Sequence, residues 1–145
     1  MRDTATRKKD VLAALEGQGD HWLSTSDPAG RPHVIGVSAL WDGNELVVTT
    51  LGSSRTARNL AANPQAVLAH GEPGDAVVVR AEVVDGAFVQ DSAELAERWK
   101  AAMGWDPREN EGWMFFRLRP TQIQAFRGYD EIEGRDVMRG SRWLA

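Results

Sequence analysis

One stretch of the sequence, residues 49–64, combines residue types and spacing that suit the binding of an anion. It reads TTLGSSRTARNLAANP: the end of an apolar run, a turn with glycine and two serines, and a helix expected over 55–62. Either serine can cap that helix, because a serine oxygen accepts a hydrogen bond from an otherwise unpaired helix N–H. Arg55 and Arg58 follow in and near the first turn, where the helix dipole favours acidic residues instead.

Two interpretations of this stretch remain open. A helix N-terminus that carries arginines and hydroxyl groups is suited to an anion, most often a phosphate. Alternatively, Arg55 and Arg58 are solvated on a surface helix, and each loses roughly 0.3–1 kcal/mol against the dipole. No acidic residue lies between Glu45 and Glu72, so the stretch carries net positive charge in either case.

Other kinds of catalytic chemistry have little support in the sequence. The chain lacks cysteine and contains no GxSxG, GxGxxG or Walker motif. Its three histidines, His21, His33 and His70, do not have the spacing of metal ligands, so we predict no metal site. The paired glutamates near 110 and 132 lie in polar segments and favour solvent exposure over acid–base catalysis. No catalytic residue is assigned.

The elements that must position residues 49–64 are mostly strands joined by short turns. Alternating and apolar runs predict strands over 21–26, 33–41, 45–50, 65–70, 76–84, 113–118 and 123–126. Helices are predicted over 4–16, 55–62 and from a capping box at Asp91 and Glu94 to Met103. Pro120 is expected to break the chain between the last two strands. Tight turns imply antiparallel pairing, and six or seven such strands favour a barrel.

Composition limits the class of protein. The length of 145 residues fits a single domain over 1–145 with a real core. A formal net charge of −4 argues against a general nucleic-acid binder. No apolar run is long enough to span a membrane, and the charged N-terminus lacks a signal sequence, so we expect a cytoplasmic protein with no membrane partner.

Several segments in order resemble the pyridoxamine 5′-phosphate oxidase-like superfamily. These are DPAGRPH at 27–33, VSALWDG at 37–43, the whole 49–64 stretch and QAVL at 65–68. The resemblance covers roughly 21–126. It implies a mainly β (α+β) fold: a six- to seven-stranded antiparallel split β-barrel of the FMN-binding type, with short flanking helices. It also implies a homodimer with two cofactor sites at the subunit interface.

The resemblance also implies which residues hold the cofactor, either FMN or, alternatively, the deazaflavin coenzyme F-420. Ser54, Arg55 and Thr56 match the segment that holds the cofactor phosphate, with Thr56 in place of the usual lysine, and Arg58 lies close enough to compensate. Thr49 and Thr50 match a hydrogen-bonding pair at the end of the preceding strand.

The ring of the cofactor is expected on the second strand. Val37, Ser38 and Ala39 match the strand whose backbone lines the flavin ring, and the small side chains of Gly36, Ser38 and Ala39 would let a planar group approach. Phe126 stands where a family tryptophan reaches the partner's flavin. Trp113, with its neighbours Phe115 and Phe116, either closes the slot from the partner or belongs to the barrel core.

The function implied is a flavin-type oxidoreductase that transfers hydride between the cofactor and a small conjugated substrate. The cofactor would carry the chemistry, which agrees with the lack of an acid–base or nucleophilic constellation. The arginine–histidine motif that binds substrate in the oxidase itself has no clear counterpart, so pyridoxamine phosphate is not the expected substrate. The alternative function is a non-enzymatic carrier or sensor of the same fold that binds flavin, haem or a tetrapyrrole. A third possibility, a protein-interaction module, would bind no chromophore.

Overall fold

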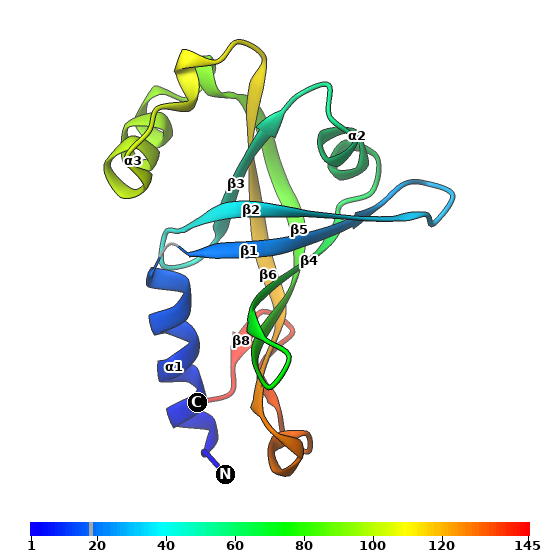
Figure 1. Ribbon diagram of the computed structural model, residues 1–145, viewed down its shortest axis with the longest axis vertical. Coiled ribbons are helices and arrows are strands. Elements are labelled where there is room, and N and C mark those ends of the chain that lie inside the picture. The colour runs from blue at the N-terminus through cyan, green and yellow to red at the C-terminus, as the bar shows by residue number, and fades with distance from the viewer. Residues whose placement is uncertain (18) are drawn as a thin grey trace.

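The computed structural model describes residues 1–17 and 19–145, which form three α-helices, eight strands and short 3-10 turns (Figure 1). The helices are α1 (Thr4–Glu16), α2 (Arg55–Ala62) and α3 (Ala93–Met103). The strands are β1 (Asp20–Ser26), β2 (Pro32–Trp41), β3 (Leu46–Leu51), β4 (Gln65–Glu72), β5 (Asp75–Phe88), β6 (Trp113–Arg127), β7 (Asp136–Arg139) and β8 (Arg142–Trp143).

The strands form an antiparallel barrel with a short extension. They follow the order β3-β2-β1-β4-β5-β6-β7-β8, and an additional β3–β6 pairing closes the first six into a barrel. β2 changes partner along its length: residues 32–38 pair with β1, whereas residues 39–41 pair with β3. The predicted split-barrel class is therefore confirmed, with β7 and β8 added at the edge.

β3 is covered on both faces, which explains the three consecutive apolar residues at 46–48 with which it begins. Leu46 and Val48 point into the barrel core, whereas Val47 belongs to a second cluster beneath α3. The second cluster joins Leu40 of β2 and Phe115 of β6 to Trp99 of α3. The strand that leads into α2 is thus held from inside and outside the barrel.

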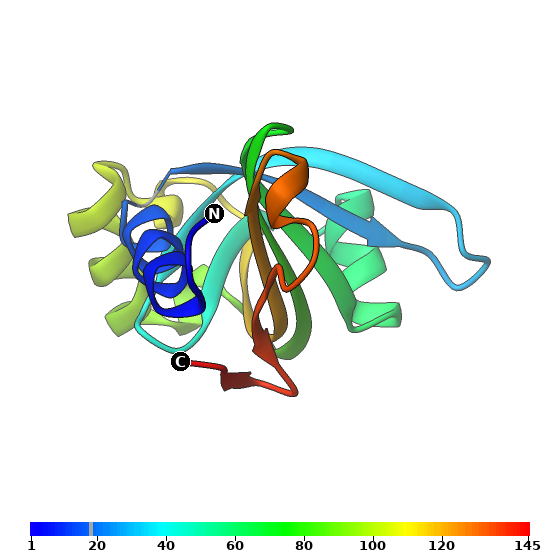
Figure 2. The ribbon, with the colours of Figure 1, turned by 90° about the horizontal axis from the view of Figure 1, so that it is seen from below.

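The helices lie on opposite sides of the barrel. α1 and α3 flank one side and α2 the other, as both views show (Figures 1 and 2). Asp3 is the N-cap of α1, and its side chain accepts a hydrogen bond from the Thr6 N–H. The helix buries Val11 and Leu15. Within residues 1–17 and 19–145, no helix is long and apolar enough to cross a lipid bilayer.

An ion-paired contact joins the N-terminus to the segment after β6. The Glu131 carboxylate is almost fully buried and accepts hydrogen bonds from the guanidinium and backbone N–H of Arg2 and from the backbone N–H of Arg127. Asp10 of α1 accepts a further hydrogen bond from Arg2. The hydrogen bonds from Arg2 lower the pKa of Glu131 to about 2.

Two predictions about element boundaries are wrong. Pro120 does not break the chain, because β6 runs through it. The register against β5 shifts between Arg80 and Ala81, so that Pro120 pairs with Ala81 and Thr121 is left as an extra residue. Such a bulge accommodates the missing proline N–H. Asp91 belongs to a 3-10 turn, and α3 begins after Ser92 without a side-chain cap.

Candidate functional site

The N-terminus of α2 is held in place by a small hydroxyl network. Ser54 is the N-cap, and its Oγ accepts a hydrogen bond of 3.1 Å from the Ala57 N–H. The same oxygen lies 3.1 Å from Thr50 Oγ1 at the end of β3. The end of the strand and the start of the helix are therefore tied through side chains, and the first helix N–H groups point away from any intrahelical acceptor.

The two arginines of this helix are available for an external anion. Arg55 and Arg58 are exposed, and neither side chain makes a hydrogen bond or ion pair with residues 1–17 or 19–145. The first turn of α2 contains no acidic residue. Two free guanidinium groups thus lie beside unpaired backbone N–H groups, which is the electrostatic arrangement of a phosphate site.

Thr56 is buried, unlike Arg55 before it. The residue is 1% exposed and its side chain is uncharged, so this position adds no charge to the surface. At the second helical position, its backbone N–H belongs to the unpaired first turn.

Buried amides fix the orientation of α2 against β1. Asn59 is 4% exposed, and its Nδ2 donates a hydrogen bond of 3.1 Å to Thr25 Oγ1. At the helix end, Asn63 Nδ2 donates to Ser26 Oγ at 2.9 Å. Leu60 packs into the barrel core between these two contacts. Sequence reasoning missed Asn59, although an asparagine in mid-helix is an unfavourable residue that signals a tertiary role.

The turn that enters α2 packs closely against the end of the 105–112 loop. Gly52 N–H donates a hydrogen bond of 2.8 Å to the Gly112 carbonyl oxygen. A methyl group at Gly52 would lie 3.0 Å from that oxygen and 3.2 Å from Met114 Sδ. Glycine is therefore favoured here by the close approach of the two segments, because any larger residue would push Gly112 or Met114 away by a few tenths of an ångström.

Thr49 and Trp113 lie on the outer side of the β3–β6 pair. Thr49 Oγ1 donates a hydrogen bond of 2.9 Å to the Met114 carbonyl oxygen. Trp113 is half-buried, and its ring centre is 6.4 Å from that of Trp105 in an edge-to-face arrangement. Phe115 and Phe116 are buried within this protomer, so they are core residues. Of the three neighbouring aromatic residues, only Trp113 reaches the surface.

The predicted ring-binding strand presents alternating faces. Ala39 is fully buried and Val37 packs against the barrel core, whereas Gly36 and Ser38 face outward. A Cβ built at Gly36 would meet no atom within 4 Å, so the strand surface is open there. On β2, a flat ligand would meet backbone and small outward-facing groups.

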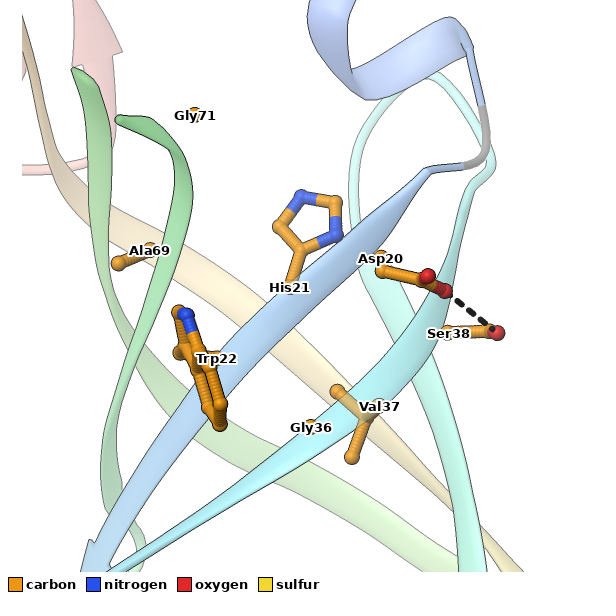
Figure 3. A pocket seen from close by; sticks show the side chains of 8 residues that line it. All are labelled: Asp20, His21, Trp22, Gly36, Val37, Ser38, Ala69 and Gly71. Carbon is orange, nitrogen blue, oxygen red and sulfur yellow. Dashed lines mark hydrogen bonds between the residues drawn. The ribbon is translucent and has the colours of Figure 1, made fainter. Parts of the chain in front are cut away.

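This open surface belongs to a hollow of about 450 Å³, which we term the β1–β2–β4 hollow (Figure 3). It is lined by residues 20–22 of β1, residues 36–38 of β2, and Ala69 and Gly71 of β4. Ser38 Oγ donates a long hydrogen bond of 3.4 Å to Asp20 Oδ1, as the dashed line in Figure 3 shows. Trp22, which pairs with Gly36 in this hollow, is 61% exposed. The alternation in HWLSTS could have indicated that Trp22 points outward.

The structure brings the predicted residues together in two groups and separates one. Thr50, Ser54, Arg55 and Arg58 cluster at α2, and residues 37–39 lie on the neighbouring strand β2. Phe126 is half-buried near the far end of β6, opposite Ala76 of β5. Around the closed barrel, its strand β6 is separated from β2 by β3 on one side and by β1, β4 and β5 on the other.

The arrangement has the parts of a binding site for an anionic, planar ligand rather than of a hydrolase. It offers a cationic helix start, a flat strand surface and aromatic residues at the edge. Among residues 1–17 and 19–145, no group of three or more His, Asp or Glu side chains is arranged to hold a metal ion.

Comparison with a family model supports the sequence resemblance. Residues 8–127 match the model described as pyridoxamine 5′-phosphate oxidase. No functionally curated protein matches the sequence at a significant level.

Solved structures share the same barrel. An F420 reductase superimposes with a TM-score of 0.62 at 25% identity, over 77% of this chain and 93% of that one. The general stress protein 26 from Bacillus anthracis str. Sterne has a TM-score of 0.67 at 18% identity, over 82% and 92%. The haem storage protein HutZ from Vibrio cholerae has a TM-score of 0.62 at 19% identity, over 94% and 99%. At these identities the last two indicate a common fold alone.

Proposed function

Because the chain belongs to the pyridoxamine 5′-phosphate oxidase family, we propose that it is an oxidoreductase that binds a flavin-type cofactor, either FMN or coenzyme F-420. The observation that carries the proposal is the pair of exposed arginines at the start of α2, whose side chains have no partner among the described residues. Two uncompensated cations at a helix N-terminus destabilise the protein alone. A bound anion would compensate their charge.

The cofactor phosphate would be held by Ser54, Arg55 and Arg58, with the backbone N–H of Thr56. Thr50 orients the Ser54 hydroxyl through the 3.1 Å contact, and Asn59 keeps the helix in position from the core side. A guanidinium that donates to a phosphate contributes about 1.5–3 kcal/mol. The two arginines would therefore supply the charge that the family lysine provides elsewhere.

The ring would lie along the outer face of β2, over the backbone of residues 37–39. The inward orientation of Val37 and Ala39 supports this placement, because their side chains leave the strand backbone open. Thr49 and Trp113 would border the ring from β3 and β6.

We further propose a homodimer in which Phe126 contacts the cofactor of the other protomer. The support is the family match, together with the half-buried side chain of Phe126, part of which is accessible to another protomer.

When bound, the cofactor supplies hydride transfer to a small conjugated substrate. The residues of this chain bind the phosphate, orient the ring and exclude water from one of its faces. The similarity to an F420 reductase at 25% identity supports F-420 as the cofactor. The match to the oxidase model supports FMN.

The test is a titration of the purified chain with FMN and with F-420, followed by absorbance and by isothermal calorimetry. We expect one of the two to bind, and Arg55→Ala to weaken it roughly 10- to 100-fold, as the loss of a charged hydrogen bond predicts. Arg98→Ala on α3 is the matched control, because Arg98 is also exposed on a helix and also unpaired among the described residues. Failure of both cofactors to bind, or equal effects of the two substitutions, would refute the proposal.

A chromophore-binding protein without turnover remains the second candidate. Its support is limited to the shared fold of the haem storage protein. A haemin titration in the same experiment distinguishes it: binding of haemin with no response to FMN or F-420 would replace the oxidoreductase proposal.

A further inference from the structure

Two histidines that are far apart in the sequence lie side by side in the structure. His21 at the start of β1 and His70 near the end of β4 have ring centres 4.9 Å apart, with planes inclined by 38°. Their spacing in sequence gave no indication of a metal site, because the contact arises only when β1 pairs with β4.

Both imidazoles have the same hydrogen-bonding arrangement. His21 Nδ1 lies 2.9 Å from the Gly19 carbonyl oxygen, and His70 Nδ1 lies 3.1 Å from the Asp20 carbonyl oxygen. A carbonyl oxygen only accepts, so Nδ1 carries the proton in each ring. In the neutral ring, Nε2 is then the unprotonated nitrogen with a free lone pair. Metal-binding histidines are oriented in this way, with the second nitrogen bound to a backbone carbonyl.

One of these lone pairs is left without a partner inside the protein. His21 is 3% exposed, and its Nε2 makes no hydrogen bond within the described part of the chain. A buried acceptor without a partner costs about 1–3 kcal/mol, which a bound ion would recover.

We propose that His21 and His70 form a two-histidine site for a divalent transition-metal ion such as Zn²⁺ or Cu²⁺. An imidazole nitrogen binds Zn²⁺ at about 2.0–2.1 Å, which puts two ring centres roughly 5 Å apart around a tetrahedral ion. The observed separation matches that value. Imidazole nitrogens prefer transition-metal ions such as Zn²⁺ and Cu²⁺ over Mg²⁺ and Ca²⁺. Among the divalent transition-metal ions, Cu²⁺ binds most tightly.

The surroundings leave the ion open to further ligands. His21 borders the β1–β2–β4 hollow, and Figure 3 shows its ring projecting from β1 toward the side on which Gly71 lies. The half-buried His70 borders a second hollow of about 200 Å³, between β4, β5 and α1. With two protein ligands, water or a small anion completes the coordination, so the ion is exchangeable rather than structural. The site does not depend on the proposed cofactor.

The experiment is a calorimetric titration of the chain, without a histidine tag and after treatment with a chelator, with ZnCl₂ and with MgCl₂. We expect one Zn²⁺ per chain and no heat from Mg²⁺. His70→Ala should weaken Zn²⁺ binding at least tenfold, and because His70 is only half-buried this variant is expected to fold. His33→Ala is the matched control, since His33 pairs with Thr25 at the other end of the β1–β2 ladder.

A second measurement tests His21 without a substitution in the core. In nitrogen-detected imidazole spectra, Zn²⁺ should shift the Nε2 resonances of both His21 and His70 and leave their Nδ1–H signals in place. Three results would overturn the proposal. They are no binding of Zn²⁺, an equal loss of Zn²⁺ affinity in His70→Ala and His33→Ala, and an Nε2 shift at only one of the two rings.

Discussion

Replacement of Glu131 by glutamine tests the contact that joins the two ends of the chain. Glu131 Oε1 lies 2.7 Å from Arg2 Nη2, and Oε2 accepts the Arg2 backbone N–H at 2.7 Å. Oε1 also accepts the backbone N–H of Arg127 at 2.7 Å. The side chains of Glu131 and Arg2 are only 3% and 12% exposed, so water screens the ion pair weakly. Glutamine keeps the shape of this residue and removes its charge.

The size of the effect follows from the pKa of Glu131. Hydrogen bonds from Arg2 lower this pKa from 4.5 to about 2 in the folded protein. A shift of that size corresponds to roughly 3 kcal/mol of stability at neutral pH. Because the folded pKa is the lower one, this contribution is complete above the unfolded value of about 4.5 and disappears as the pH falls toward 2.

The assay is urea denaturation of the wild-type chain and Glu131→Gln at pH 7 and at several values down to pH 3. At pH 7 we expect the variant to be less stable by about 3 kcal/mol, and its melting temperature to fall by roughly 10 °C. The difference between the two proteins should shrink as the pH falls below about 4.5, because the unfolded wild-type chain then binds a proton at Glu131 that the folded protein binds only near pH 2. Glu133→Gln is the matched control, since Glu133 is exposed and has no ion pair in the described structure.

Two results would refute this reasoning. A loss below about 0.5 kcal/mol at pH 7 would place Glu131→Gln among ordinary surface substitutions. A large loss that stays constant from pH 7 to pH 3 would show that shape, and not the carboxylate charge, holds the contact together.

Two further predictions concern α2 and α3. Arg55→Glu should stabilise the cofactor-free protein by about 0.5–1 kcal/mol, because it places an acid at the helix N-terminus and removes repulsion with Arg58, yet it should abolish binding of the cofactor. Thermal denaturation and cofactor titration measure the two effects, and a lower melting temperature without cofactor would contradict the electrostatic argument. Trp99→Phe should cost less than about 1.5 kcal/mol, because the buried Trp99 Nε1 has no partner among the described residues, whereas Trp99→Ala should cost about 3–5 kcal/mol. Equal losses in denaturant titrations would mean that the indole N–H has a partner.

The local signals in the sequence predicted the elements well. The helices at Thr4–Glu16 and Arg55–Ala62 have the predicted limits, because an apolar stripe and strong end signals coincide in each. The predictions failed where distant pairing overrides a local signal. Pro120 was expected to end a strand, but the bulge at Thr121 lets β6 continue without a hydrogen bond from the proline nitrogen. The C-terminal strands β7 and β8 were not predicted, because these short segments become strands only against β6 and each other.

The candidate site was predictable where its residues are consecutive. The start of α2 at Ser54 and Arg55 could be predicted from the sequence, because capping and charge effects act over a few residues. The burial of Thr56 and the anchoring role of Asn59 could not, because both depend on how α2 packs against β1. The pairing of His21 with His70 also lies beyond the sequence, since it requires the register of β1 against β4.

The double coverage of β3 has a consequence for how the chain folds. Its partner strand β6 lies far downstream, with Leu46 opposite Leu118, and its outer face is covered only when α3 docks. Closing such distant contacts is slow compared with forming hairpins. Until about the first 118 residues have been synthesised, β3 has one unpaired edge and an uncovered apolar face, a combination that favours aggregation. We therefore expect residues 46–51, which lead into α2, to stay prone to aggregation until α3 and β6 have been synthesised.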